Sequence, residues 1–92
     1  TPFAGTLNLR LDEEGTRQRA ILEKKVGLEV KPEVGYYPGY LYKAKLKDTI
    51  CYIVIPKMPS YPKDVIEIIA KDNLRQKYSL KDGEKVTVKV TV

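Results

Sequence analysis

The sequence predicts a small, mostly β protein that closes into a barrel and carries one or two short helices. About five short stretches have the patterning of strands, turn signals separate them, and at most two brief helices are indicated. The chain has 92 residues, enough for one hydrophobic core and one site. We therefore expect a single domain over residues 1–92.

The first strand is predicted at residues 6–11. Its leucines fall on one face and Thr6, Asn8 and Arg10 on the other, which is the period-two pattern of a half-buried strand. Residues 12–15 are expected to form a turn. Thr16 then caps a short predicted helix over residues 17–25 that ends at Gly27.

A hairpin is predicted in the middle of the chain. After a loop at Gly35, Pro38 and Gly39, residues 40–47 alternate between apolar side chains and mainly lysines. A short turn at Asp48 and Thr49 leads into residues 50–55, an apolar run of strand length.

The last third combines a proline-rich loop, two strands and a brief helix. Pro56, Pro59 and Pro62 predict an extended loop, because each removes a backbone donor and restrains its predecessor. Residues 65–70 form the next predicted strand, and residues 73–78 one or two helical turns. A tight turn at residues 80–83, which ends in Asp-Gly, precedes a final strand with valines at 86, 88, 90 and 92 on one face.

The amino-acid composition excludes several classes of protein and several kinds of site. Hydrophobic residues make up 42% and charged residues 32%, which is too apolar for a disordered chain and too charged for a membrane span. The sequence has one cysteine and no histidine, so an internal disulfide, the usual zinc sets and the Ser-His or Cys-His nucleophile pairs are excluded. A net charge of +5 suits an anionic partner, but lysine-rich surfaces also occur in heat-adapted proteins.

The start of the chain gives two further expectations. No basic start with an apolar run and a cleavage site is visible, so we expect a cytoplasmic protein. The chain begins Thr1-Pro2-Phe3 without an initiator methionine, and strand-like alternation starts soon after, so we expect a fragment or a rearranged chain.

Three polar residues are candidates for chemistry. Glu67 is a lone carboxylate in the otherwise apolar strand 65–70, so it is either an outward-facing charge on an exposed strand or a base or ligand-binding carboxylate in a cleft. Thr6 and Asn8 stand two residues apart on one strand face, so their oxygens are either two hard ligands for Mg²⁺ or parts of an ordinary polar face. Cys51 is interpreted as a small core residue.

Four stretches together resemble the archaeal CTP-dependent riboflavin kinases. The first is Gly5-Thr6-Leu7-Asn8-Leu9-Arg10-Leu11-Asp12, and the second is Ile55-Pro56-Lys57. The third joins residues 65–70 to Asn73-Leu74-Arg75, and the fourth is Leu80-Lys81-Asp82-Gly83-Glu84. The resemblance covers nearly the whole chain. It implies a six-stranded Greek-key barrel of the cradle-loop type.

The resemblance also implies an activity and roles for particular residues. The activity is transfer of the γ-phosphate of CTP to the 5′-hydroxyl of riboflavin, giving FMN and CDP. By match, Thr6 and Asn8 are the Mg²⁺ ligands and Glu67 is the carboxylate that contacts flavin near its reactive hydroxyl. Asp72, Asn73, Leu74 and Arg75 correspond to the segment that holds the nucleotide. A base and a metal are what phosphoryl transfer requires.

The sequence departs from the family pattern at two places. A threonine of the loop before the glutamate strand contacts flavin in the family; here the matching position is Pro59, and Ser60 beside it is expected to substitute. The family's first strand and its glycine-rich nucleotide-binding segment have no counterpart ahead of Gly5. We therefore expect CTP binding to depend on more than these residues.

Two other hypotheses stay open. One is a non-catalytic basic barrel that binds nucleic acid through Lys43, Lys45, Lys47, Lys85 and Lys89, with Tyr36, Tyr37, Tyr40 and Tyr42 as stacking surfaces. The other is an engineered or truncated barrel without activity. On the kinase hypothesis the partners are small molecules, with no nucleic acid or membrane partner, and we expect a monomer.

Overall fold

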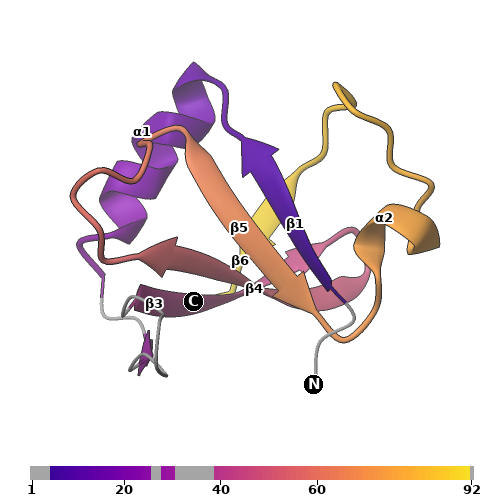
Figure 1. The fold of residues 1–92 in the computed structure, drawn as a ribbon, viewed down its shortest axis with the longest axis horizontal. Coiled ribbons are helices and arrows are strands. Elements are labelled where there is room, and N and C mark those ends of the chain that lie inside the picture. The colour runs from indigo at the N-terminus through magenta and orange to yellow at the C-terminus, as the bar shows by residue number, and fades with distance from the viewer. Residues whose placement is uncertain (1–4, 26–27, 31–38, 92) are drawn as a thin grey trace.

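A computed structural model describes residues 5–25, 28–30 and 39–91, and in them six strands and two short helices (Figure 1). The strands are β1 (Gly5–Arg10), β2 (Leu28–Val30), β3 (Gly39–Leu46), β4 (Thr49–Pro56), β5 (Val65–Ala70) and β6 (Val88–Val90). The helices are α1 (Glu13–Leu22) and α2 (Leu74–Lys77). The predicted mostly β class with short helices is confirmed. The predicted helix end at Gly27, the predicted loop and stacking residues at positions 35–38, and the predicted strand end at Val92 lie outside the described residues.

The strands form one antiparallel sheet that curls into a half-barrel. Five of them follow the order β1-β5-β4-β3-β2, and β6 pairs with β3. Because β4 occupies the other edge of β3, β2 and β6 share one edge, beside residues 39–41 and 44–46 respectively. Within the described ranges β1 pairs only with β5 and β6 only with β3, so these residues show an open half-barrel and not the closed six-stranded barrel.

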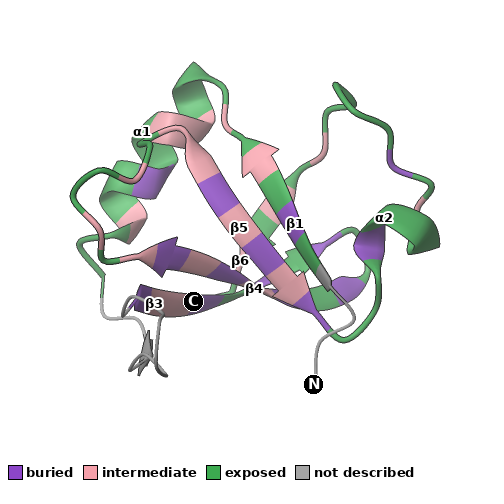
Figure 2. Cartoon of the chain, in the orientation of Figure 1, coloured by how far each residue is buried: buried purple, intermediate pink, exposed green. Residues whose placement is uncertain are grey.

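The core lies on one face of this curled sheet. Period-two alternation sends every second side chain of β3, β4 and β5 inward, as the alternating burial colours in Figure 2 show. The buried apolar side chains are Leu7, Tyr42, Ala44, Leu46, Cys51, Ile53, Ile55, Ile66, Ile68, Ala70, Leu74 and Leu80. The interpretation of Cys51 as a core residue is confirmed, since it is fully buried.

The hairpin turn differs by one residue from the prediction. The turn is formed by Lys47 and Asp48, and Lys47 adopts a positive φ of 53°. Thr49 pairs with Leu46 as the first residue of β4 and is buried. The sequence pattern missed this because a threonine beside Asp48 is a common turn residue, whereas here its side chain packs inward.

The first helix starts earlier than predicted, and its cap is not Thr16. Asp12 is the N-cap: its Oδ1 accepts a hydrogen bond from the Gly15 amide at 2.7 Å. Glu13 and Glu14 fill the first turn, where carboxylates interact favourably with the helix dipole. Thr16 lies inside the helix and donates its hydroxyl to the Asp12 carbonyl oxygen at 2.8 Å. The predicted turn at residues 12–15 is therefore wrong.

The predictions for the second helix and for the Asp-Gly turn are confirmed, whereas those for the proline-rich loop and for the length of the final strand are corrected. α2 forms within residues 73–78 with Asn73 as its N-cap, and Gly83 takes a positive φ of 85° in its turn. The proline-rich loop is folded into turns instead of being extended, and the Tyr61 amide donates to the Met58 carbonyl at 3.0 Å. The final strand is shorter than predicted, because residues 84–87 are irregular.

Candidate functional site

The polar face of β1 and the carboxylate of β5 share one side of the sheet. Asn8 is the direct cross-strand partner of Glu67, and Thr6 is the partner of Ile69. Directly opposed residues of an antiparallel pair project from the same face, so Thr6, Asn8 and Glu67 stand on the face turned away from the core. The neighbours Ile66 and Ile68 are 5% and 1% exposed, so they point inward.

Glu67 sits in a partly desolvated environment. Its side chain is half-buried, and Asn8 and Val54 flank it on the two adjacent strands. The nearby Tyr61 comes from the loop before β5. Burial raises the pKa of the Tyr61 phenol, and the negative charge of Glu67 raises that pKa further. Of the two interpretations given for Glu67, the one in a cleft is not supported by the hollows found among the described residues, because Glu67 lines neither of the two described below.

Thr6 borders a small hollow that it shares with the start of α2. This hollow of about 110 Å³ is lined by Thr6, Leu7, Ile68, Ala70, Asp72, Asn73, Leu74 and Arg75. All four residues of the predicted nucleotide segment are therefore beside one of the two predicted metal ligands. Segments more than 60 positions apart in the sequence meet because β1 runs alongside β5, which leads directly into α2 (Figure 1).

Local contacts hold the segment at residues 72–75 in place. Asn73 accepts a hydrogen bond from the Gln76 amide at 3.1 Å as the α2 cap, and Leu74 is buried in the core. Asp72 pairs with Lys77 at 3.1 Å, and the guanidinium of Arg75 pairs with Asp82 at 3.0 Å. Both ion pairs are solvent-exposed, so anionic ligands can compete with Asp82 for Arg75 at little energetic cost.

A larger groove opens between β1, α1 and the C-terminal segment. Its volume is about 880 Å³, and apolar side chains of β1, Ile53, Ile66 and the valines at 86, 88 and 90 form much of its lining. Asn8 and Arg75 also border it. Thr6 and Asn8 share a strand face as predicted, but each lines a different hollow, and both are exposed.

The loop before β5 presents Pro59 and Ser60 to solvent, whereas Tyr61 is half-buried. Of these three, Tyr61 is the residue that Glu67 affects electrostatically. The guanidinium carbon of Arg19 lies 5.5 Å from the centre of the Tyr61 ring. Sequence reasoning missed both Tyr61 and Arg19; the only signal was the position of Tyr61 between Pro59 and Pro62.

The lysines of the basic-barrel hypothesis gather around β3 and β6. Lys45 is the direct partner of Lys89, and Lys43 lies two residues before Lys45; all three are exposed. Lys47 lies 5.0 Å from the centre of the Tyr78 ring. Tyr40 and Tyr42 face the core side of β3, so they are not a stacking surface beside these lysines. Tyr36 and Tyr37 lie outside the described residues.

The side-chain oxygens of Thr6 and Asn8 suit a hard metal ion. The described part of the chain contains no cluster of three or more cysteine or acidic residues that could hold a metal by itself. Thr6 and Asn8 offer two neutral oxygens on one face, which fits a hard ion such as Mg²⁺ that keeps several waters and completes its shell with substrate phosphates.

Among the described helices, neither is long and apolar enough to cross a membrane.

Comparisons with known proteins agree on one family. Residues 1–90 match the family model that carries the label CTP-dependent riboflavin kinase and the description "Domain of unknown function DUF120". The chain is 40% identical to a riboflavin kinase of Methanospirillum hungatei, over 100% of this chain and 43% of that protein. It is also 40% identical to a riboflavin kinase of Saccharolobus solfataricus, over 99% of the chain and 55% of that protein.

A further relative is matched over more of its own length. The chain is 35% identical to a riboflavin kinase of Methanobrevibacter smithii, over 95% of this chain and 71% of that protein. The chain spans about half the length of the first two relatives.

Proposed function

The chain belongs to the CTP-dependent riboflavin kinase family, and from this premise we propose that it forms the core of an enzyme that phosphorylates riboflavin. The reaction transfers the γ-phosphate of CTP to the 5′-hydroxyl of riboflavin and releases FMN and CDP. The observation that carries the proposal is the shared face of Thr6, Asn8 and Glu67, with Thr6 beside residues 72–75.

Each group on this face has a task in phosphoryl transfer. Glu67 accepts the proton of the ribityl hydroxyl, or a hydrogen bond from it, and so directs an oxygen lone pair at the phosphate. Its partial burial beside Tyr61 strengthens this interaction, because electrostatic effects grow where water is excluded. Pro59 and Ser60 contact the flavin from the adjoining loop.

The nucleotide occupies the opposite end of the face. Asp72, Asn73 and Leu74 form its floor at the start of α2, and Arg75 exchanges its exposed partner Asp82 for a phosphate. Thr6 and Asn8 would hold Mg²⁺ through their side-chain oxygens, and the bound ion would supply charge neutralisation at the phosphates. The chain's own residues orient the acceptor.

The same premise extends to architecture and partners. The half-barrel is proposed as the greater part of a six-stranded cradle-loop barrel with Greek-key topology, closed across the groove between β1 and β6. The partners are then riboflavin and CTP, and the protein works as a monomer.

A direct assay tests the proposal. Riboflavin, Mg²⁺ and either CTP or ATP are incubated with the protein at its full natural length, and FMN is separated and quantified by its absorbance. We expect FMN with CTP and far less with ATP. Failure to form FMN from either nucleotide, together with no binding of riboflavin, would rule the function out.

A further inference from the structure

Arg19 is a charged side chain that the fold buries. It is 5% exposed, whereas the side chain of Arg17, two residues earlier on α1, is 66% exposed. Burying a guanidinium is unfavourable unless its donors are satisfied. A surface helix such as α1 gains nothing by turning an arginine inward unless the arginine has partners there.

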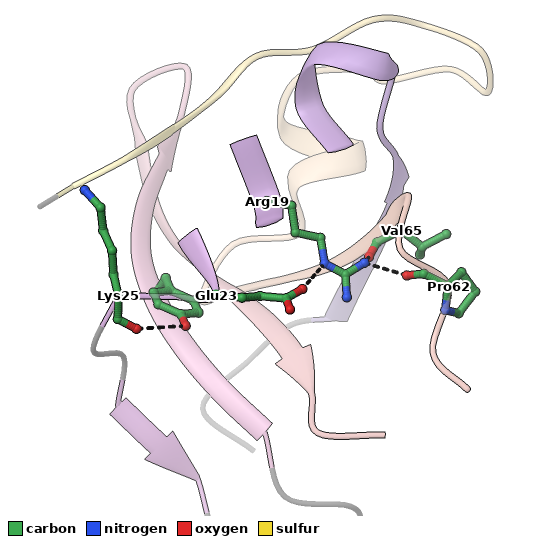
Figure 3. Close-up of polar contacts among 6 residues, drawn as sticks. Arg19, Glu23, Lys25, Pro62 and Val65 are labelled. Carbon is green, nitrogen blue, oxygen red and sulfur yellow. Dashed lines mark hydrogen bonds and ion pairs between the residues drawn. The ribbon is translucent and has the colours of Figure 1, made fainter. Parts of the chain in front are cut away.

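The hydrogen-bond partners of Arg19 lie at the end of α1 and at the turn that leads into β5. Arg19 Nε donates to Glu23 Oε1 at 2.9 Å, and its Nη1 donates to the carbonyl oxygens of Pro62 and Val65, the latter at 2.7 Å. Figure 3 shows the guanidinium between Glu23 on one side and the two carbonyl groups on the other. One planar group thus joins α1 to both ends of the turn that leads into β5.

The same turn is held from a second direction. The Leu11 amide, at the end of β1, donates to the Asp64 carbonyl at 2.6 Å. The turn at residues 62–65 is therefore bonded to β1 and to α1, and β5 starts at a fixed place only two residues before Glu67. Tyr61 precedes this turn, and its ring lies against the Arg19 guanidinium.

These contacts connect Arg19 to the flavin end of the proposed site. We propose that Arg19 is a positioning residue that holds the loop at residues 57–64 so that Tyr61 and its neighbours Pro59 and Ser60 face Glu67. The inference rests on the proposed function, because it assigns this loop to riboflavin and not to CTP. Arg19 itself need not touch substrate.

Substitution by lysine isolates the feature that matters. Lysine keeps the charge and can still pair with Glu23, but it lacks the planar fork that serves several acceptors at once. Arg19→Lys should therefore loosen the loop and leave the rest of the molecule folded. Arg17→Lys is the matched control, because Arg17 lies on the same helix, is exposed, and within the described residues forms an ion pair with Glu14 at the surface.

The test compares the two variants with the wild type in three measurements at the protein's full natural length. We expect Arg19→Lys to raise KM for riboflavin and its Kd, measured by flavin fluorescence, about tenfold, with kcat and KM for CTP nearly unchanged. Amide hydrogen exchange at residues 60–65 should accelerate, whereas exchange in β3 and β4 should not. Arg17→Lys should match the wild type throughout.

The outcomes separate this inference from the proposed function. Wild-type affinity and KM for riboflavin in Arg19→Lys, or an equal rise of KM for both substrates, would overturn the positioning role. If the wild type makes no FMN, the proposed function fails. The inference is then tested by amide hydrogen exchange alone, and an unchanged exchange rate at residues 60–65 in Arg19→Lys would overturn it. Should Arg19→Lys not fold, Tyr61→Leu removes the ring that Arg19 packs against, and the same riboflavin-specific loss is expected.

Discussion

Asn8 and Glu67 are direct cross-strand partners in the β1–β5 ladder, and both stand on the face turned away from the core. This pairing brings an amide oxygen and a carboxylate from segments 59 positions apart in the sequence onto one surface. Because directly opposed side chains lie about 5 Å apart at the β-carbon, a ligand bound to one is within reach of the other. The pairing thus joins the metal end and the acceptor end of the proposed site.

Glu67→Gln tests the acceptor end. The change keeps the shape of the side chain and removes its charge, so turnover should fall by roughly a hundredfold or more if the carboxylate acts as base. Stability should change little, since Glu67 makes no ion pair among those found in the described residues. Steady-state kinetics and thermal unfolding measure the two effects, with the exposed Glu13→Gln as control. Unaltered turnover and flavin affinity would make Glu67 a tolerated surface charge.

Asn8→Ala tests the metal end. We expect most turnover to be lost, and the remaining activity to need more Mg²⁺, because a single hydroxyl ligand is left on β1. Folding should be preserved to within about 0.5 kcal/mol, since the side chain is exposed. A Mg²⁺ titration of the rate measures this, with the exposed strand variant Lys45→Ala as control. Full activity with the wild-type Mg²⁺ dependence would remove Asn8 from the metal site.

The basic-barrel hypothesis gives a contrasting expectation. If Lys43, Lys45 and Lys89 serve nucleic acid, binding of single-stranded DNA should appear at low salt and weaken steeply as salt rises. We expect no such binding, because two of the four tyrosines named in that hypothesis, Tyr40 and Tyr42, point to the core side of β3 and so do not stack beside these lysines. Fluorescence anisotropy at low ionic strength decides the matter: salt-sensitive binding that Lys45→Ala weakens would favour the nucleic-acid hypothesis.

Strands were predictable because their signal is local. The alternation in β1, β3 and β5 places one side chain in two against the core, and a lone glutamate breaking an apolar run is visible without a structure. The helix start was missed because residues 12–15 contain a glycine and resemble a turn. What fixes the start is the carboxylate of Asp12 acting as a cap.

The loop before β5 was not predictable for a different reason. Three prolines indicate an extended chain, yet the loop is folded, and Arg19, more than 40 positions earlier, bonds to the carbonyl groups of Pro62 in the loop and of Val65 at the start of β5. Carbonyl groups are present at every residue, so no sequence pattern marks the two that receive such a bond. The hollow beside Thr6 was also not predictable from a local pattern, because it forms where β1 and α2 meet at the end of β5.

The contact between Thr49 and Tyr78 should contribute measurably to stability. Their hydroxyl oxygens are 2.6 Å apart, and they join the start of β4 to the end of α2. Tyr78→Phe should cost about 1–2 kcal/mol, because it leaves the buried Thr49 hydroxyl without this partner. Thr49→Val should cost less, because the half-buried Tyr78 hydroxyl can turn to water.

Urea unfolding of both single variants and the double variant measures the coupling, which should lie near 1 kcal/mol. Tyr52→Phe, on the outer face of β4, is the control. Strict additivity of the two changes would show that the hydrogen bond contributes nothing.

Cys51 gives a prediction on pH. Burial raises the pKa of its thiol above the ordinary value near 9. The thiol of the unfolded chain ionises first as pH rises, so the unfolded state gains stability there while the native thiol stays protonated. The contribution of Cys51 is therefore complete below about pH 8 and is progressively lost above about pH 9.

The change Cys51→Ala isolates this effect. The variant is less stable at neutral pH, because it leaves a cavity in the core beside Ala44, the cross-strand partner of Cys51, and Ile53 on the same face of β4. Its deficit relative to the wild type should shrink as pH rises from about 8 to 10, since only the wild type loses the thiol contribution. Urea unfolding across this range measures the deficit, and iodoacetamide should label native Cys51 far more slowly than the unfolded chain. A constant deficit together with rapid native labelling would show that the thiol is accessible and ionises in the folded protein.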